Sequence, residues 1–453
     1  MIVHERFLTV THREIPMEDG SLLAPYFRRL ENLSTARWYG RVTKAVGHIV
    51  ESVGPFCSLG ECCEILGPSG DPHAGEIVGF RGTTVISMPL DRLSGIRYGD
   101  RIVTWGAKAT LRVGEELLGR VIDGAGKPLD SQGDYHARDY WPLHAPGPTA
   151  LNRKLITEPL GCGVRAIDAF LTCGRGQRMG IFGGSGVGKS TLLGLMARGS
   201  AADVTVMALV GERGREVREF LEKTLGEEGR RRSVVVVSTS DQSPLLRIRA
   251  AMVATAVSEY FALKGKSVLL VVDSLTRFAM AQREIGLAAG EPPTAKGYTP
   301  SVFTLLAQLI ERAGHFHGGS ITAFYTVLME GDDQQDPMVD AVRALLDGHI
   351  VLDRRLGAQN HYPSISILDS LSRLMPAICG PEHLEKARRL RKLLASYAAS
   401  EDLVRVGAYQ KGLDPVLDQA IEALPALTKF LQQRGDEKMP LNATLAALQA
   451  LPG

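Results

Sequence analysis

A glycine-rich run at residues 183–191, GGSGVGKST, constrains the fold of this chain more than any other stretch. Apolar residues at 179–182 precede it and TLLGLMAR follows it, so it joins a predicted strand to a predicted helix. In that context the pattern Gly-x4-Gly-Lys-Ser is a P-loop, whose backbone N–H groups and helix dipole bind phosphate. We expect Lys189 to reach the β- and γ-phosphates of a nucleotide and the Ser190 hydroxyl to ligate Mg²⁺. A chance glycine-rich turn is the weaker alternative. The predicted nucleotide-binding residues of the loop are Gly183, Gly184, Ser185, Gly186, Val187, Gly188, Lys189, Ser190 and Thr191.

Residues 176–370 alternate between apolar strand-like runs and helical patterns. The runs VTVMALV, SVVVVS, SVLLVVD and SITAFYTVL are examples. Such alternation predicts a parallel sheet with helices on both faces.

Two carboxylates follow predicted strands of this sheet, where open parallel sheets bind ligands. Asp273 ends LLVVD, and we expect it to hold Mg²⁺ through water. An N-cap of the next helix is the alternative for this aspartate. Glu212 follows VTVMALV, and we expect it to polarise the attacking water from one sheet position away from the P-loop. The start of a solvated, charged helix is its alternative.

The texture of the sequence changes along the chain and predicts separate domains. Short strand-like runs separated by Gly, Pro and Asp indicate a small β-barrel, and the pattern after Pro381 is mostly helical. The expected division is a polar leader at 1–37, a β-barrel at 38–96, a nucleotide-binding domain at 97–379 and a helical domain at 380–453.

Composition excludes several classes of protein. The net charge of +2 provides no strong field for nucleic acid, and no apolar run approaches the ~20 residues of a membrane helix. The N-terminus is too polar for a secretory signal. The six cysteines form no CxxC pair, which fits buried thiols in a reducing cytoplasm.

Several long stretches resemble the catalytic subunits of the rotary ATP synthase superfamily. The resemblance is closer to the type III secretion ATPases, and among them to the flagellar protein-export ATPases. It implies an α/β fold with a RecA-like P-loop core, an N-terminal β-barrel and a C-terminal helical domain, assembled into a homohexamer. Besides the P-loop, the stretches that carry it are 119–130, 211–220, 273–286, 290–303 and 367–375.

The resemblance assigns roles around the phosphates. It makes Glu212 the catalytic carboxylate and places Arg213 in the same motif. Glu216 matches an acidic residue near the metal and its waters. Arg277 matches an arginine on the phosphate side.

Two further roles rest on the resemblance alone. Arg373, in SLSRLM, matches the arginine that reaches the γ-phosphate of the neighbouring subunit. Tyr362, in HYPSI, matches the aromatic that stacks on adenine. Without the family, a surface ion pair would be expected for Arg373 and a half-buried surface aromatic for Tyr362.

The resemblance also implies partners. The leader would bind a regulatory stalk protein, and the acidic loop at 330–337 would touch a coiled-coil central stalk. ATP hydrolysis would release chaperones and unfold and deliver export substrates at a membrane gate, on the cytoplasmic face of the inner membrane. The stretch 406–421 is more similar to the flagellar branch than to the virulence branch.

The sequence alone leaves four other functions open. They are a virulence-type secretion ATPase, the catalytic subunit of a true rotary ATP synthase, a non-catalytic nucleotide-binding subunit and a ring-shaped RNA translocase. Glu212 argues against the non-catalytic subunit. A balanced charge and the lack of an aromatic-basic platform argue against RNA, so no nucleic-acid partner is expected. Glu212 and Arg373 in one chain favour a homohexamer over an alternating ring.

Overall fold

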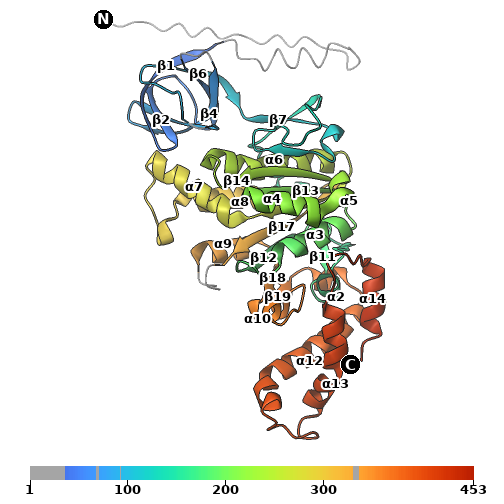
Figure 1. The fold of residues 1–453 in the computed structure, drawn as a ribbon. Helices are drawn as coiled ribbons and strands as arrows, with labels where there is room; N and C mark the ends of the chain where they lie inside the picture. Colours follow the sequence, from blue (N-terminus) through green and yellow to red (C-terminus); the bar gives the residue numbers. More distant parts are fainter. Residues whose placement is uncertain (1–35, 68–70, 92, 330–335, 453) are drawn as a thin grey trace, which may run out of the picture.

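The computed structural model describes residues 36–67, 71–91, 93–329 and 336–452 of the chain. A β-barrel lies at one end, a sheet flanked by helices lies in the middle, and a group of helices lies at the other end (Figure 1). Almost all of the predicted leader and most of the acidic loop at 330–337 fall outside the described residues.

The N-terminal strands close into a barrel in the order β1-β2-β5-β4-β3-β6. Alternate residues face inward, as in β3, where Cys63 and Ile65 are buried and their neighbours are partly exposed. Strand β6 pairs with both β1 and β3. The strands are β1 Trp38–Val46, β2 Ile49–Val53, β3 Glu61–Leu66, β4 Pro72–Arg81, β5 Thr84–Pro89 and β6 Arg101–Lys108.

The barrel therefore extends beyond residue 96, where the sequence analysis placed its end. The segment at 93–100 is a turn-rich connection within the barrel rather than a domain boundary. Its glycines and charges have the texture of a linker, but without β6 the barrel would have two open edges.

The central sheet runs in the order β19-β18-β12-β17-β15-β13-β14-β8, and β16 pairs with β17 outside this path. Strands β18 to β8 along this path are parallel, and the edge strand β19 is antiparallel. The strands are β8 Val121–Asp123, β12 Arg178–Gly183, β13 Val204–Glu212, β14 Ser233–Thr239, β15 Ser267–Asp273, β16 Gly314–His315, β17 Ser320–Leu328, β18 Gly348–Leu352 and β19 Ile365–Ser372.

This order corrects one expectation. Strand β13, which delivers Glu212, is separated from the P-loop strand β12 by β17 and β15. Both intervening strands come later in the chain, so neighbours in sequence are not neighbours in the sheet.

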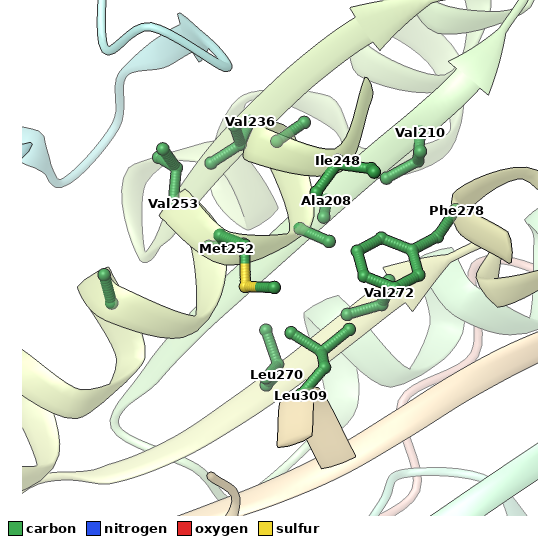
Figure 2. Packing of buried hydrophobic residues seen from close by; sticks show 14 of the residues in the cluster. Ala208, Val210, Val236, Ile248, Met252, Val253, Leu270, Val272, Phe278 and Leu309 are labelled. Carbon is green, nitrogen blue, oxygen red and sulfur yellow. The ribbon is translucent and has the colours of Figure 1, made fainter. Parts of the chain in front are cut away.

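Helices cover both faces of the sheet, which explains why its strands are continuously apolar. Figure 2 shows one face, where Ala208, Val236 and Leu270 of the strands meet side chains of α6, α7 and α8. The other face packs against α2, α3 and the C-terminal helices. The helices of this region are α2 Arg165–Phe170, α3 Lys189–Gly199, α4 Gly214–Glu219, the π-helical η3 Phe220–Leu225, α5 Gly226–Arg231, α6 Pro244–Leu263, α7 Leu275–Ala289, η4 Ala295–Gly297, α8 Pro300–Ile310, α9 Pro337–Leu345, α10 Arg354–Ala358 and α11 Met375–Ile378.

Short elements link the barrel to the sheet, and three helices follow it. The C-terminal helices are α12 Pro381–Arg405, α13 Pro415–Leu431 and α14 Leu441–Gln449. The linking elements are β7 Thr110–Val113, η1 Glu115–Leu117, β9 Asp139–Pro142, η2 Ala150–Asn152, β10 Pro159–Leu160 and β11 Cys173–Gly174. Within the described ranges, none of the helices combines the length and apolarity needed to cross a membrane.

Candidate active site

The glycine-rich run forms the predicted loop between a strand and a helix. Strand β12 ends at Gly183 and α3 begins at Lys189. Gly186 and Gly188 have φ of 79° and 86°, a left-handed conformation that favours glycine. Val187 is buried and anchors the loop in the core, while Ser185 and Gly186 are exposed. The backbone N–H groups of the loop and the N-terminus of an eleven-residue helix therefore meet at one place.

A cavity of about 780 Å³ opens over this loop. It collects residues from the carboxyl ends of β12, β13, β15 and β17 and from the connection after β18. Among the residues that line it are Gly184, Ser185, Gly186, Gly188, Lys189, Ser190, Thr191, Glu212, Arg213, Glu216, Asp273, Arg277 and Arg354.

Lys189 and Asp273 are in direct contact at the bottom of this cavity. The Lys189 Nζ lies 2.6 Å from Asp273 Oδ1, and the Thr326 hydroxyl donates a hydrogen bond of 2.6 Å to the same oxygen. Both charged side chains are largely buried, so the pair is weakly screened by water. Asp273 is thus not the N-cap of α7. Ser274 fills that position, and its side chain accepts the N–H of Arg277.

Glu212 is the second buried acid of the cavity. Its side chain is 13% exposed, and its Oε1 lies 3.3 Å from the Arg277 Nε. Burial raises the pKa of the Glu212 carboxyl, and repulsion from Asp273 raises it further. Lys189 and Arg277 lower the pKa in part. A carboxylate with a raised pKa is a stronger base, which suits a group that orients or deprotonates water.

Arg213 and Glu216 form the rim of the cavity. The Arg213 Nη1 lies 3.5 Å from Glu216 Oε1, and the arginine side chain is 75% exposed. The interaction of Glu216 with Glu212 also raises the pKa of the Glu212 carboxyl. Arg213 therefore lies at the mouth of the site and Glu216 connects the mouth to the buried acid.

The donor set around the loop suits Mg²⁺. Ser190, Asp273 and Glu216 offer hydroxyl and carboxylate oxygens, the ligands that this hard cation prefers. The described residues contain no cluster of three or more His, Cys, Asp or Glu side chains that could hold a metal. Mg²⁺ does not require one, because it usually binds through one or two protein groups, waters and substrate phosphates.

A second cavity of about 500 Å³ shares Gly188 and Thr191 with the first. Tyr362, which is 37% exposed, lines it, and its ring lies 3.1 Å from where a Cβ on Gly188 would stand. Residues from the segment 432–437, which follows α13, form another wall of this cavity. This cavity lies at the end of the P-loop, and an aromatic ring such as that of Tyr362 is suited to stack on a nucleotide base.

Arg373 is the predicted site residue that the structure does not bring to the loop. It is exposed, it follows β19, and its backbone N–H donates to the Asp347 carbonyl beside the start of β12. The P-loop follows the other end of β12, and the two ends of this six-residue strand are five steps, or about 17 Å at ~3.3 Å per step, apart. An arginine side chain is too short to bridge that distance to its own P-loop.

Comparisons with known proteins now decide the family. The nucleotide-binding domain of the ATP synthase alpha/beta family matches residues 163–372 and its beta-barrel domain matches 42–106. The C-terminal domain of the T3SS EscN ATPase matches 379–450. The flagellum-specific ATP synthase of Bacillus subtilis is 49% identical over 94% of this chain and 97% of its own. The type 3 secretion system ATPase of Xanthomonas euvesicatoria is 48% identical over 94% of this chain and 96% of its own.

The chain belongs to the flagellar and type III secretion ATPase family.

Solved structures agree with this assignment. Two structures of the assembled ATPase EscN from enteropathogenic E. coli are 43% identical to this chain, with TM-scores of 0.85 and 0.84. Each alignment covers 91% of this chain and 100% of the other, and the second structure contains the central stalk EscO. The predicted architecture of barrel, P-loop core and C-terminal helices is confirmed. This secretion ATPase is an enzyme that hydrolyses ATP.

Sequence reasoning missed two parts of the site of this secretion ATPase. Arg354, the first residue of α10, lines the phosphate-side cavity, yet it stands in no motif that signals phosphate. The wall at 432–437 is an irregular segment with no pattern of its own. Only the apolar run at 350–352 before the Arg354-Arg355 pair could have suggested the first, because a residue that follows a strand can lie at the ligand-binding edge of the sheet.

Proposed function

We propose that this chain assembles into a homohexamer whose ATP hydrolysis energises protein export through the flagellar type III secretion apparatus. The observation that carries the enzymatic part is the convergence of Lys189, Asp273 and Glu212 around the P-loop. The export part rests on the 49% identity to a flagellum-specific relative and on the stretch 406–421.

The geometry supports a division of labour during hydrolysis. Lys189, which contacts Asp273, binds the β- and γ-phosphates, and Arg277 adds a second positive charge. Glu212 orients the attacking water in line with the γ-phosphate. Ser190, Asp273 and Glu216 would hold Mg²⁺, which would supply charge that neutralises the phosphates. Phosphoryl transfer needs mainly such positioning and charge neutralisation.

The position of Arg373 supports a ring. Its guanidinium is exposed at the sheet edge opposite to its own P-loop, where a neighbouring subunit can receive it. The same chain carries Glu212, so identical subunits can supply both halves of every site. An arginine from a neighbour suits the planar, charged transition state of the γ-phosphate.

The proposed partners follow the relatives. A coiled-coil central stalk would contact the loop at 330–337, in keeping with the stalk bound in the EscN complex. A regulatory stalk protein would bind the leader at 1–37. Export chaperones, their substrates and the membrane proteins of the export gate would meet the ring at the cytoplasmic face of the inner membrane.

The experiment is the ATPase rate of the purified chain alone, with Mg²⁺ and with EDTA. Mg²⁺-dependent hydrolysis without any other subunit or RNA supports the proposal. A rate that appears only with a partner subunit indicates a rotary synthase, and a rate that appears only with RNA indicates a translocase. Restored motility in a flagellated bacterium lacking its own export ATPase tests the flagellar assignment, and restored virulence secretion alone contradicts it.

A further inference from the structure

We infer that Arg165 is a positioning residue that fixes the base-side wall of the nucleotide site. The wall at 432–437 has no helix or strand to hold it in place, although it lines the second cavity together with Tyr362. An irregular segment can define a binding cavity only if other groups immobilise it. Arg165 is the residue from the nucleotide-binding domain that contacts this segment most extensively among those described.

Arg165 binds the wall through its backbone and its whole guanidinium. It begins α2, and its side chain is 11% exposed. Its Nε donates to the Phe430 carbonyl at 2.7 Å, and its backbone N–H donates to Gln433 Oε1 at 2.9 Å. The guanidinium also donates to the Gln432 carbonyl and forms an ion pair with Glu437. One buried arginine thus holds both ends of the wall.

Gln433 extends the same connection to Tyr362. Its side-chain nitrogen donates to the Gly163 carbonyl at 2.8 Å, and its backbone N–H donates to the Tyr362 carbonyl at 2.8 Å. Gly163 is itself fixed, because its N–H donates to the buried carboxylate of Asp168. The two sides of the base cavity are therefore tied to each other and to the segment before α2.

These contacts attach the wall to the nucleotide-binding domain, although the wall follows a C-terminal helix. The width of the base cavity then depends on the planar fork of Arg165, which a lysine cannot reproduce. The inference rests on the proposed role of this cavity as the base site. It predicts that changes at Arg165 weaken the binding of ATP but not the binding of phosphates alone, because the phosphate-side cavity does not include the wall.

The test compares Arg165→Lys and Arg165→Gln with the wild-type ring. We expect KM for ATP to rise about tenfold in Arg165→Lys and further in Arg165→Gln, with kcat within about twofold, since charged hydrogen bonds of the wall are lost. Magnesium tripolyphosphate, which has no base, should inhibit all three proteins equally. Glu437→Gln should give a smaller rise in KM, because the carbonyl contacts of Arg165 remain.

Arg312→Lys is the matched control. Arg312 is also buried, pairs with Glu259 at 2.7 Å and donates to the Leu143 carbonyl at 2.6 Å, and it lines neither of the two cavities. It should lower thermal stability and leave KM unchanged. Tyr362→Ala removes the proposed stacking partner of the base. It therefore tests the base-site assignment separately from the role of Arg165.

An Arg165→Lys ring with normal KM for ATP beside a Tyr362→Ala ring with raised KM overturns the role of Arg165 alone. Normal KM in both overturns the base-site assignment and the inference with it. The inference is also overturned if Arg165→Lys weakens inhibition by tripolyphosphate as much as it weakens the affinity for ATP. The substitution would then disturb the whole site. Should Arg165→Gln fail to fold, Arg165→Lys and Glu437→Gln decide the question.

Discussion

The two halves of the proposed nucleotide site are built in different ways. The phosphate half consists of charged side chains at the carboxyl ends of parallel strands, with Lys189, Asp273 and Glu212 as its centre. The base half consists of an exposed tyrosine and an irregular segment held by hydrogen bonds to carbonyl groups. The phosphate half should therefore set the chemical rate and the affinity for any polyphosphate, and the base half should add affinity for ATP alone.

The largest effect is expected from Arg373→Ala, which removes the charge that a neighbour supplies. The variant should assemble and bind ATP yet hydrolyse about 10³–10⁵-fold more slowly, as expected for an arginine finger. Mixed rings of Arg373→Ala and Lys189→Ala protein should regain activity at interfaces that join two intact groups, provided that these interfaces can fire independently. The comparison of monomeric proteins provides the opposite outcome. If monomeric Arg373→Ala protein hydrolyses ATP more slowly than monomeric wild-type protein by this full factor, the arginine acts in the site of its own subunit.

Glu212→Gln should slow ATP hydrolysis without weakening the binding of ATP. The amide keeps the shape of the side chain and removes the base, so kcat should fall by about 10²–10⁴. The affinity for ATP, measured by titration calorimetry, should change little. Near-normal turnover in a folded ring would rule Glu212 out as the group that activates water.

Arg354→Gln should have a smaller effect, on KM rather than kcat. Arg354 lines the phosphate cavity from the β18 side, whereas Arg355 next to it pairs with Asp353 at 2.9 Å. We expect KM for ATP to rise about fivefold. A buried hydrogen bond to a charged group contributes ~1.5–3 kcal/mol, and the effect here should be smaller because Arg354 is exposed. Arg355→Gln is the control, and equal effects of the two substitutions would remove Arg354 from the site.

The smallest effect concerns stability and pH in nucleotide-free protein with EDTA. The folded chain holds the proton of Glu212 more tightly than the unfolded chain, because the pKa of this carboxyl is raised. Stability should therefore decline as pH rises from the ordinary range of glutamate through the raised pKa, and then level off. Glu212→Gln lacks this decline, so its Tm should exceed that of the wild type at pH 8 and match it in acid. A difference that instead widens on acidification would contradict the raised pKa.

The same contrast explains what the sequence could predict. The P-loop, Asp273 and Glu212 stand in short patterns whose meaning is local: a glycine-rich turn, or an acid after an apolar run. The expectation that Glu212 lies one sheet position from the P-loop was wrong because β15 and β17 insert between β12 and β13. The barrel end was misplaced because a turn-rich segment precedes its closing strand.

The base-side wall could not be predicted, because tertiary contacts create it. Gln433 meets Gly163 across 270 positions of sequence, and the contact uses a carbonyl group that every residue carries. Tyr362 was assigned only through the family resemblance. A backbone carbonyl leaves no signature in a sequence, whereas a catalytic carboxylate does.

The most direct test of the two-part site is to titrate ATP and magnesium tripolyphosphate into three rings. These are the wild type, Tyr362→Ala and Lys189→Ala. Tyr362→Ala should bind ATP about tenfold more weakly, within the ~1–3 kcal/mol range of base–aromatic stacking, and bind tripolyphosphate normally. Lys189→Ala should lose affinity for both ligands. Equal losses for both ligands in Tyr362→Ala, or normal tripolyphosphate binding in Lys189→Ala, would contradict the division of the site into a phosphate half and a base half.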